Sequence, residues 1–322
     1  MTFAGRYRAG LALAATIFLA TPAVALQPAP AAPPATAPAA ASVAEPRPAI
    51  WLLEDEDTKI YLFGTTHAFP ATVRWRSPRL NEIVATADEL VLEIAEQGSA
   101  DFASSSMSAD DFARMLLPEP SPILDRVPET LRPRLRAALD AIGAPMERWD
   151  RMHIWAAAFA LSGIRAAEEA TARFGADALR AEQSSAETVL ADAFRQRGKP
   201  ISGVETGDAQ LGALANLSME DQFAFLEAAL DGRGMGAVGN DLNAGTWTRG
   251  DVDAIAAEMA TMPPVLIQAL LVNRNRTWTT WLTERLERPG TVLFAVGAGH
   301  LVGSDSVQVM LAARGLTVRR ID

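Results

Sequence analysis

The sequence contains no cysteine, only three histidines and no excess of basic residues. The absence of cysteine excludes disulfide bonds, thiolate catalysis and cysteine-based zinc or iron–sulfur sites. Any imidazole chemistry therefore depends on His67, His153 or His300. The formal net charge of −10 argues against a basic surface of the kind that nucleic acids and anionic membranes require. We accordingly expect no nucleic-acid partner.

The remaining composition is that of an ordinary globular protein. Of the 322 residues, 49% are hydrophobic and 21% are charged, which excludes a disordered chain and a coiled-coil rod. The length allows one large domain or two modest ones, either of which can bury a full hydrophobic core.

Residues 1–25 have the pattern of a secretory signal peptide. Arg6 and Arg8 precede an apolar run at residues 11–20, and the Ala-Val-Ala sequence at residues 23–25 is a small-x-small cleavage signal. The apolar run is too short to span a bilayer comfortably. We expect an exported protein, periplasmic or secreted, without stable membrane insertion after processing. An uncleaved membrane anchor is the alternative.

Residues 26–48 consist almost entirely of proline and alanine and form the expected linker. Such a segment has no apolar periodicity and many fixed φ angles, so it is predicted to be a semi-extended tether. The folded domain is expected to comprise residues 49–322.

Short apolar segments of strand length alternate with helical patterns along this domain. The pattern predicts an α/β fold with a central mixed sheet flanked by helices. A proline-punctuated helical insertion is expected at about residues 100–185, and one long helix at residues 265–287. Strands are expected at residues 49–54, 59–64, 89–94, 201–205, 291–296 and 316–321, and the other helices at residues 77–88, 186–197, 219–230, 252–259 and 304–314.

Four polar side chains stand at the carboxyl ends of expected strands. His67 and His300 each complete a Gly-x-x-His step directly after a strand, and Glu93 and Glu205 close the strands LVLE and ISGVE. In open α/β sheets the ligand site lies outside the carboxyl ends of the strands. Glycine lets the backbone turn sharply there. We therefore expect these four side chains to share one pocket.

Two imidazoles and two carboxylates permit two kinds of chemistry. They are a nitrogen and oxygen ligand set suited to Mn, Fe, Co or Zn, and a bound metal would make hydroxide available near neutral pH. Without a metal, a glutamate and a histidine can serve as general base and acid.

Arg274 falls in the apolar stripe of the expected helix 265–287 and needs a carboxylate partner there, unless it snorkels at the margin of the helix. That partner is either a glutamate of the site or an acidic group on a substrate. His153 lies among tryptophan and alanine and is expected to be a packed or surface residue.

Several segments resemble the TraB/PrgY/GumN family, which is similar to the Tiki metalloproteases. They are YLFGTTHAFP, ELVLEI, GKPISGVETGDAQL, TWTRGD, NRNRTW and FAVGAGHLVGSDSVQVMLAARGLTVRR. The resemblance implies a fold like that of the erythromycin-esterase group and metal-dependent hydrolysis, with peptides as a candidate substrate. Carried over residue by residue, it gives the site His67, Glu93, Glu205 and His300, with Arg274 and Asn275 in support. Where a Gly-x-Asp step is expected ahead of the helix at residue 186, this sequence has Ser185-Ala186-Glu187, so no carboxylate of that segment is included.

The sequence thus predicts an exported metal-dependent hydrolase, plausibly a peptidase, with one divalent ion (Mn, Co, Zn or Fe) bound by His67, Glu93, Glu205 and His300. Its expected partner is a peptide or another small substrate. Two alternatives stay open. One is a non-catalytic cell-envelope protein that binds a peptide or polysaccharide fragment, and the other is an esterase-like enzyme that uses His and Glu without metal.

We predict that export is accompanied by cleavage after Ala25, because the basic start, the short apolar run and the Ala-x-Ala step occur together. Mass spectrometry of the mature N-terminus measures this. A membrane-held protein that still begins at Met1 would contradict it.

Overall fold

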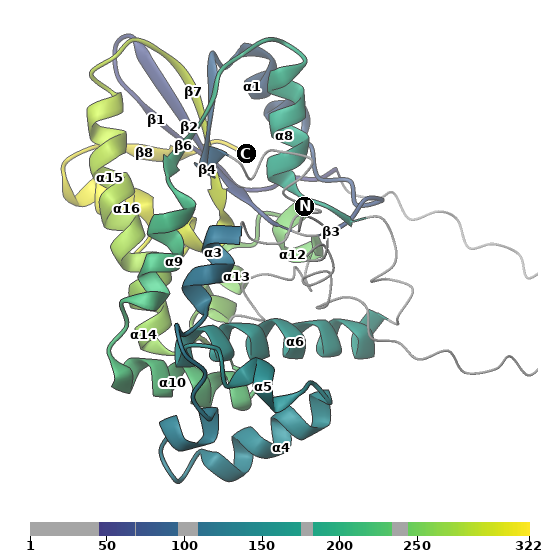
Figure 1. The fold of residues 1–322 in the computed structure, drawn as a ribbon. Helices are drawn as coiled ribbons and strands as arrows, with labels where there is room; N and C mark the ends of the chain where they lie inside the picture. The colour runs from purple at the N-terminus through teal and green to yellow at the C-terminus, as the bar shows by residue number, and fades with distance from the viewer. Residues whose placement is uncertain (1–44, 68, 96–108, 175–182, 234–243) are drawn as a thin grey trace, which may run out of the picture. The chain divides into compact units, whose positions relative to one another are not determined.

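The computed structural model of this chain describes residues 45–67, 69–95, 109–174, 183–233 and 244–322. Residues Pro46–Asp322 form one unit, and only this unit is described below. As predicted, its architecture is α/β, with a six-stranded mixed sheet flanked by helices (Figure 1).

The strand order places four parallel strands side by side. The order is β6-β4-β7-β2-β1-β8, with β6, β4, β7 and β2 parallel and β1 antiparallel to both of its neighbours. All six were expected from the sequence, and their bounds are β1 Ile50–Glu54, β2 Thr58–Thr65, β4 Glu89–Ile94, β6 Ile201–Glu205, β7 Gly290–Gly297 and β8 Val318–Arg320. A second sheet pairs β3 Phe69–Pro70 with β5 Gln183–Ser184.

The register of the sheet brings the two Gly-x-x-His turns together. β2 and β7 are adjacent and parallel, with Gly64 opposite Val296 and Thr65 opposite Gly297. β4 pairs with the other side of β7, and β6 pairs with β4. Because these four strands are parallel, their carboxyl ends lie at the same edge of the sheet.

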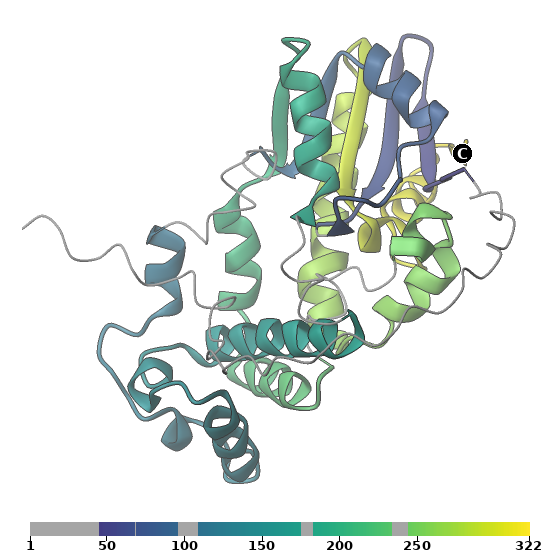
Figure 2. The same ribbon diagram turned by 90° about the vertical axis from the view of Figure 1, so that its right-hand side faces the viewer.

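Helices cover both faces of the sheet because successive strand residues point to opposite sides. Leu90 and Leu92 of β4 pack toward α1 and α8, whereas Val91 packs toward Trp278 and Leu282 of α15. Figure 2 shows α1 and α8 in front of the sheet. The helices on the first face are α1 Pro78–Thr86, α8 Ala186–Arg195 and α12 Ala244–Thr248, and those on the second are α15 Asn273–Arg285 and α16 Val307–Ala313.

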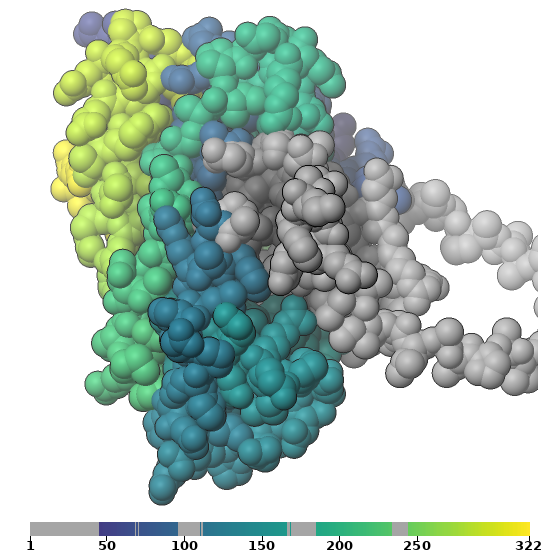
Figure 3. Space-filling view, viewed as in Figure 1, coloured from purple at the N-terminus to yellow at the C-terminus, as the bar shows by residue number. Residues whose placement is uncertain are grey.

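A separate cluster of helices lies below the carboxyl edge of the sheet in the views of Figures 1 and 2. In the space-filling view its first helices, in blue, form the lower part of the face shown (Figure 3). Its members are α3 Ala109–Met115, η3 Ile123–Arg126, α4 Arg132–Ile142, α5 Met146–Trp149, α6 Ile154–Phe174, α9 Gly207–Ala215, α10 Met219–Leu230 and α14 Pro264–Ile267.

The expected helical insertion at about residues 100–185 therefore does not form a core of its own. Trp155 of α6 shares one buried core with Phe225 of α10 and Leu266 of α14. Residues 96–108 and 175–182 of this expected insertion lie outside the described residues.

The helix expected at residues 265–287 is present as one helical run from Pro264 to Arg285, with a π-helical turn inside it that the sequence did not predict. It divides into α14, a π-helical turn at Gln268–Val272 and α15. A π-turn changes the phase of the helix on either side and is common at functional sites. Arg274, in the first turn of α15, donates from Nη1 to the carbonyl oxygen of Leu270 inside this π-turn, at 3.0 Å.

In the described part of the chain, no single helix is long and apolar enough to cross a membrane. One pair of helices, Val252–Met259 (α13) and Pro264–Arg285, is together long and apolar enough for a membrane span by length and composition alone, but the pair is bent by 120°.

Candidate functional site

The structure gathers the predicted side chains around Gly297, at the end of β7. A Cβ atom on Gly297 would lie 3.0 Å from Glu93 Oε1, 3.7 Å from His67 Nε2 and 3.7 Å from His300 Cδ2. Glu205 joins the group through Arg274. All the side chains proposed from the sequence thus meet at one edge of the sheet, and their chemical role stays a prediction.

Arg274 lies between the two glutamates. Its Nη2 donates to Glu93 Oε2 at 2.5 Å and also to Glu205 Oε1, and its Nε donates to Glu205 Oε2 at 3.1 Å. The Arg274 side chain is 11% exposed. It therefore has the carboxylate partners that a buried guanidinium requires, and it does not snorkel into solvent.

The charges of this group shift the pKa values in opposite directions. Burial alone would raise the pKa of Glu93, but Arg274, His67 and the N–H of Gly297 together hold it well below its usual range. Burial raises the pKa of Glu205 despite its hydrogen bonds with Arg274. Burial opposes the charge on Arg274, but the two carboxylates raise its pKa. Glu93 is thus firmly ionised at neutral pH.

Asn275 fixes the tautomer of His300. The Asn275 amide donates from Nδ2 to the carbonyl oxygens of Asp305 (2.8 Å) and His300 (3.4 Å), which turns its Oδ1 toward His300 Nδ1 at 2.6 Å. Arg274 Nη1, which can only donate, lies 3.1 Å from His300 Nε2. His300 is therefore neutral, with its proton on Nδ1. Burial, together with Arg274, lowers the pKa of His300 to about 3.

His67 pairs with Glu187, a residue outside the predicted site. Its Nδ1 lies 2.8 Å from Glu187 Oε1, in an ion pair whose carboxylate side chain is 3% exposed and whose imidazole is 41% exposed. The negative charge of Glu187 raises the pKa of His67 to about 9. With Nδ1 bound to Glu187, the free nitrogen is Nε2, the atom that faces Gly297.

The start of α8 places Glu187 against His67. Ser185 is the N-cap of this helix, with its Oγ accepting from Thr188 N at 3.0 Å, so Glu187 falls in the first turn. Ala186 N donates to the carbonyl oxygen of Thr66 at 3.1 Å, which ties the helix start to the residue before His67. The signal for Glu187 in the sequence is a serine N-cap with a carboxylate two residues later, in place of the expected Gly-x-Asp step.

The four predicted metal ligands do not fit one ion in this arrangement of side chains. Within the described ranges there is no group of three or more His, Asp or Glu side chains that could hold a metal ion together. At Glu205 the reason is visible, because the guanidinium of Arg274 binds both of its oxygens. Arg274 supplies the positive charge between the carboxylates.

His153 lies away from this group, as expected from its surroundings in the sequence. It directly precedes α6 in the helical cluster, where its N–H donates to the carbonyl oxygen of Met115. Partial burial and the charge of Arg126 lower its pKa.

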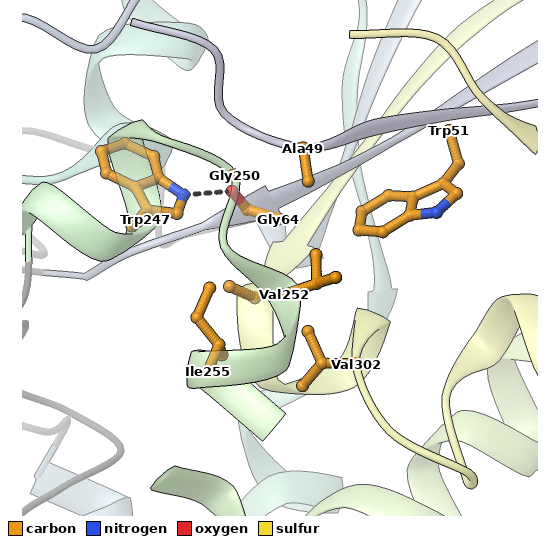
Figure 4. A pocket seen from close by; sticks show the side chains of 9 residues that line it. Ala49, Trp51, Gly64, Trp247, Gly250, Val252, Ile255 and Val302 are labelled. Atoms are coloured by element: carbon orange, nitrogen blue, oxygen red, sulfur yellow. Dashed lines mark hydrogen bonds between the residues drawn. The ribbon is translucent and has the colours of Figure 1, made fainter. Parts of the chain in front are cut away.

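A small apolar pocket lies at the end of β2 (Figure 4). Trp247 Nε1 donates to the carbonyl oxygen of Gly64 at 2.7 Å at its rim. None of the six predicted site residues lines it. The lining residues are Ala49, Trp51, Gly64, Trp247, Gly250, Val252, Ile255, Ala298 and Val302.

The fold and this edge define an α/β protein with a cluster of histidines, glutamates and one arginine at the carboxyl ends of its parallel strands. Residues 49–320 match the TraB/PrgY/gumN family, so the chain belongs to that family, as its motifs predicted. No curated protein and no solved structure matches the chain.

We predict that the three histidines titrate separately in an NMR pH titration. His67 should titrate near pH 9, and His300 should stay neutral with its proton on Nδ1 throughout the neutral range. His153 should titrate below its ordinary value and serves as the reference outside the site. Titration of His67 near 6.5 would show that the pair with Glu187 does not form in solution.

Proposed function

We propose that this chain is an exported hydrolase in which His67 transfers the proton. One observation carries the proposal: a partly exposed imidazole has its Nδ1 paired with the buried Glu187 carboxylate, while its Nε2 lies beside Gly297, next to which the Glu93 carboxylate also lies. A histidine oriented by a carboxylate is a recurrent proton-transfer group in hydrolases.

The raised pKa of His67 defines the direction of the proton transfer. At neutral pH the pair is an imidazolium beside the Glu187 carboxylate, so Nε2 carries an acidic proton. In the proposed reaction His67 gives this proton to the leaving group as the scissile bond breaks. A water molecule attacks the carbonyl carbon of the scissile bond and releases its proton to solvent, and solvent then returns a proton to His67.

Peptides or other small substrates with a basic leaving group suit this chemistry. The amine released from a peptide bond must gain a proton, and an imidazolium supplies one. The His67 side chain is 41% exposed, whereas the side chains of His300 and Glu93 are buried, so His67 is the member of the three that a substrate can reach.

A metal-dependent hydrolase is the second candidate, and one observation favours it. Both imidazoles have Nδ1 held by a neighbour, Glu187 for His67 and Asn275 for His300, which is the way metal-binding histidines are usually oriented. A divalent ion such as Mn, Co, Zn or Fe would require Arg274 to release Glu93, since the present arrangement does not fit an ion.

Metal content and peptide turnover, measured on the same purified protein, separate these candidates. The first candidate predicts turnover that survives complete removal of metal by a chelator. The second predicts that His67→Ala and His300→Ala lose both metal and turnover, while the control His153→Ala keeps both. Binding of peptide or polysaccharide fragments without any turnover would instead support a non-catalytic binding protein.

We predict that Glu187→Gln shifts the alkaline limb of the pH–activity profile to lower pH. In the wild type, activity should fall as the pH rises through about 9, because His67 then loses its proton. The glutamine keeps the shape but removes the charge that raises this pKa, so the midpoint should move toward the ordinary value of 6.5. The pH dependence of kcat/KM measures this.

Asp192→Asn, on the outer surface of the same helix, is the matched control and should leave the limb in place. An unmoved limb in Glu187→Gln would exclude His67 as the proton donor.

A further inference from the structure

Trp278 contacts three members of the site and was not among the residues proposed from the sequence. It lies on α15 one turn after Arg274, and its side chain is fully buried. Its indole Nε1 donates to Glu205 Oε2 at 3.3 Å. The ring centroids of Trp278 and His300 are 4.2 Å apart, and the guanidinium carbon of Arg274 lies 4.8 Å from the indole centre.

These contacts restrain groups that carry charge. A guanidinium over an indole face gains a cation–π interaction, which is strongest where water is excluded. The Arg274 side chain is flexible, and the indole limits the positions from which it can reach both glutamates. The same ring packs on the imidazole of His300, whose Nε2 faces Arg274 Nη1 at 3.1 Å. One side chain thus restrains both the arginine and the histidine.

Trp281, on the same helix, is a tryptophan with a packing role alone and serves as the comparison. It stacks on Phe294 of β7 with ring centroids 5.8 Å apart, and its described ring contacts include none of the site residues. Trp278 also packs against Phe294, at 6.1 Å, so the two residues share a packing neighbour. Of the two, Trp278 is the one that also contacts Glu205, His300 and Arg274.

We infer that Trp278 is a positioning residue for the proposed hydrolase: it holds Arg274 between Glu93 and Glu205 and fixes the ring of His300. The catalytic part of this inference rests on the proposed function, whereas the placement of Arg274 can be measured without any substrate.

The test compares Trp278→Phe and Trp278→Leu with Trp281→Phe and Trp281→Leu. The first readout is the NMR signal of Arg274 Nε–H, which the indole ring current shifts in the wild type. This signal is assigned by its loss in Arg274→Lys. Trp278→Leu should remove this ring-current shift, and Trp278→Phe should reduce it. Both Trp281 variants should leave it unchanged. Thermal melts identify the temperature at which all variants are folded.

The second readout is the split between kcat and KM on whichever peptide the wild type cleaves. Trp278→Leu should lower kcat about tenfold or more with little change in KM, because it misplaces charged groups rather than a substrate contact. Trp278→Phe keeps an aromatic face and loses the hydrogen bond to Glu205, so its kcat should fall less, by roughly threefold. The Trp281 variants should keep the wild-type kcat.

The outcomes separate this inference from the proposed function. If the wild type cleaves no substrate, the proposed function fails, and the Arg274 signal alone decides the role of Trp278. If Trp278→Leu does not fold, Trp278→Phe is compared with Trp281→Phe on the same readouts. Should the Trp278 variants match the Trp281 variants in both the Arg274 signal and kcat, Trp278 is a packing residue and the inference is overturned.

Discussion

The ion pairs of Arg274 with Glu93 and Glu205 are the interaction on which the rest of the site depends. Two buried carboxylates at neighbouring strand ends would repel each other, and burial would drive at least one of them to take up a proton. The guanidinium removes this conflict by binding both. In doing so it joins β4, β6 and α15 at one point. Removing one partner of such a buried pair leaves an uncompensated charge, so the three residues act as one unit.

Two glycines make room for this unit. Gly64 begins the turn that leads to His67, and Gly297 begins the turn that leads to His300. The two turns follow neighbouring parallel strands. A Cβ on Gly64 would lie 3.0 Å from the Cα of Ala298, so this glycine allows the turn after β7 to pack on the end of β2. A Cβ on Gly297 would reach Glu93 Oε1 at the same distance. The Gly-x-x-His pattern is therefore a steric requirement of the site as well as a way to turn the chain.

The sheet and the convergence of His67, Glu93, Glu205 and His300 could be predicted because apolar runs define strands and parallel strand ends share one edge. Glu187 could not be placed in the same way. Its position depends on where α8 begins relative to the loop after β2, which is a tertiary contact between Ala186 and Thr66. The π-turn before Arg274 was also missed, since the apolar stripe alone does not reveal an added residue in a helical turn.

The position of Arg274 makes the two proposed mechanisms mutually exclusive in any one arrangement of side chains. A divalent ion and a guanidinium are both cations that seek the same carboxylates, and placing them side by side in a buried site would cost electrostatic energy. Arg274 also donates to Leu270 in the π-turn and stacks on Trp278, so its displacement would break contacts beyond the site. With Arg274 in place, the proposed proton transfer depends on His67, whose side chain is the more exposed one, and on its partner Glu187. The sequence predicted which residues meet, whereas the arginine among them decides how their charges are used.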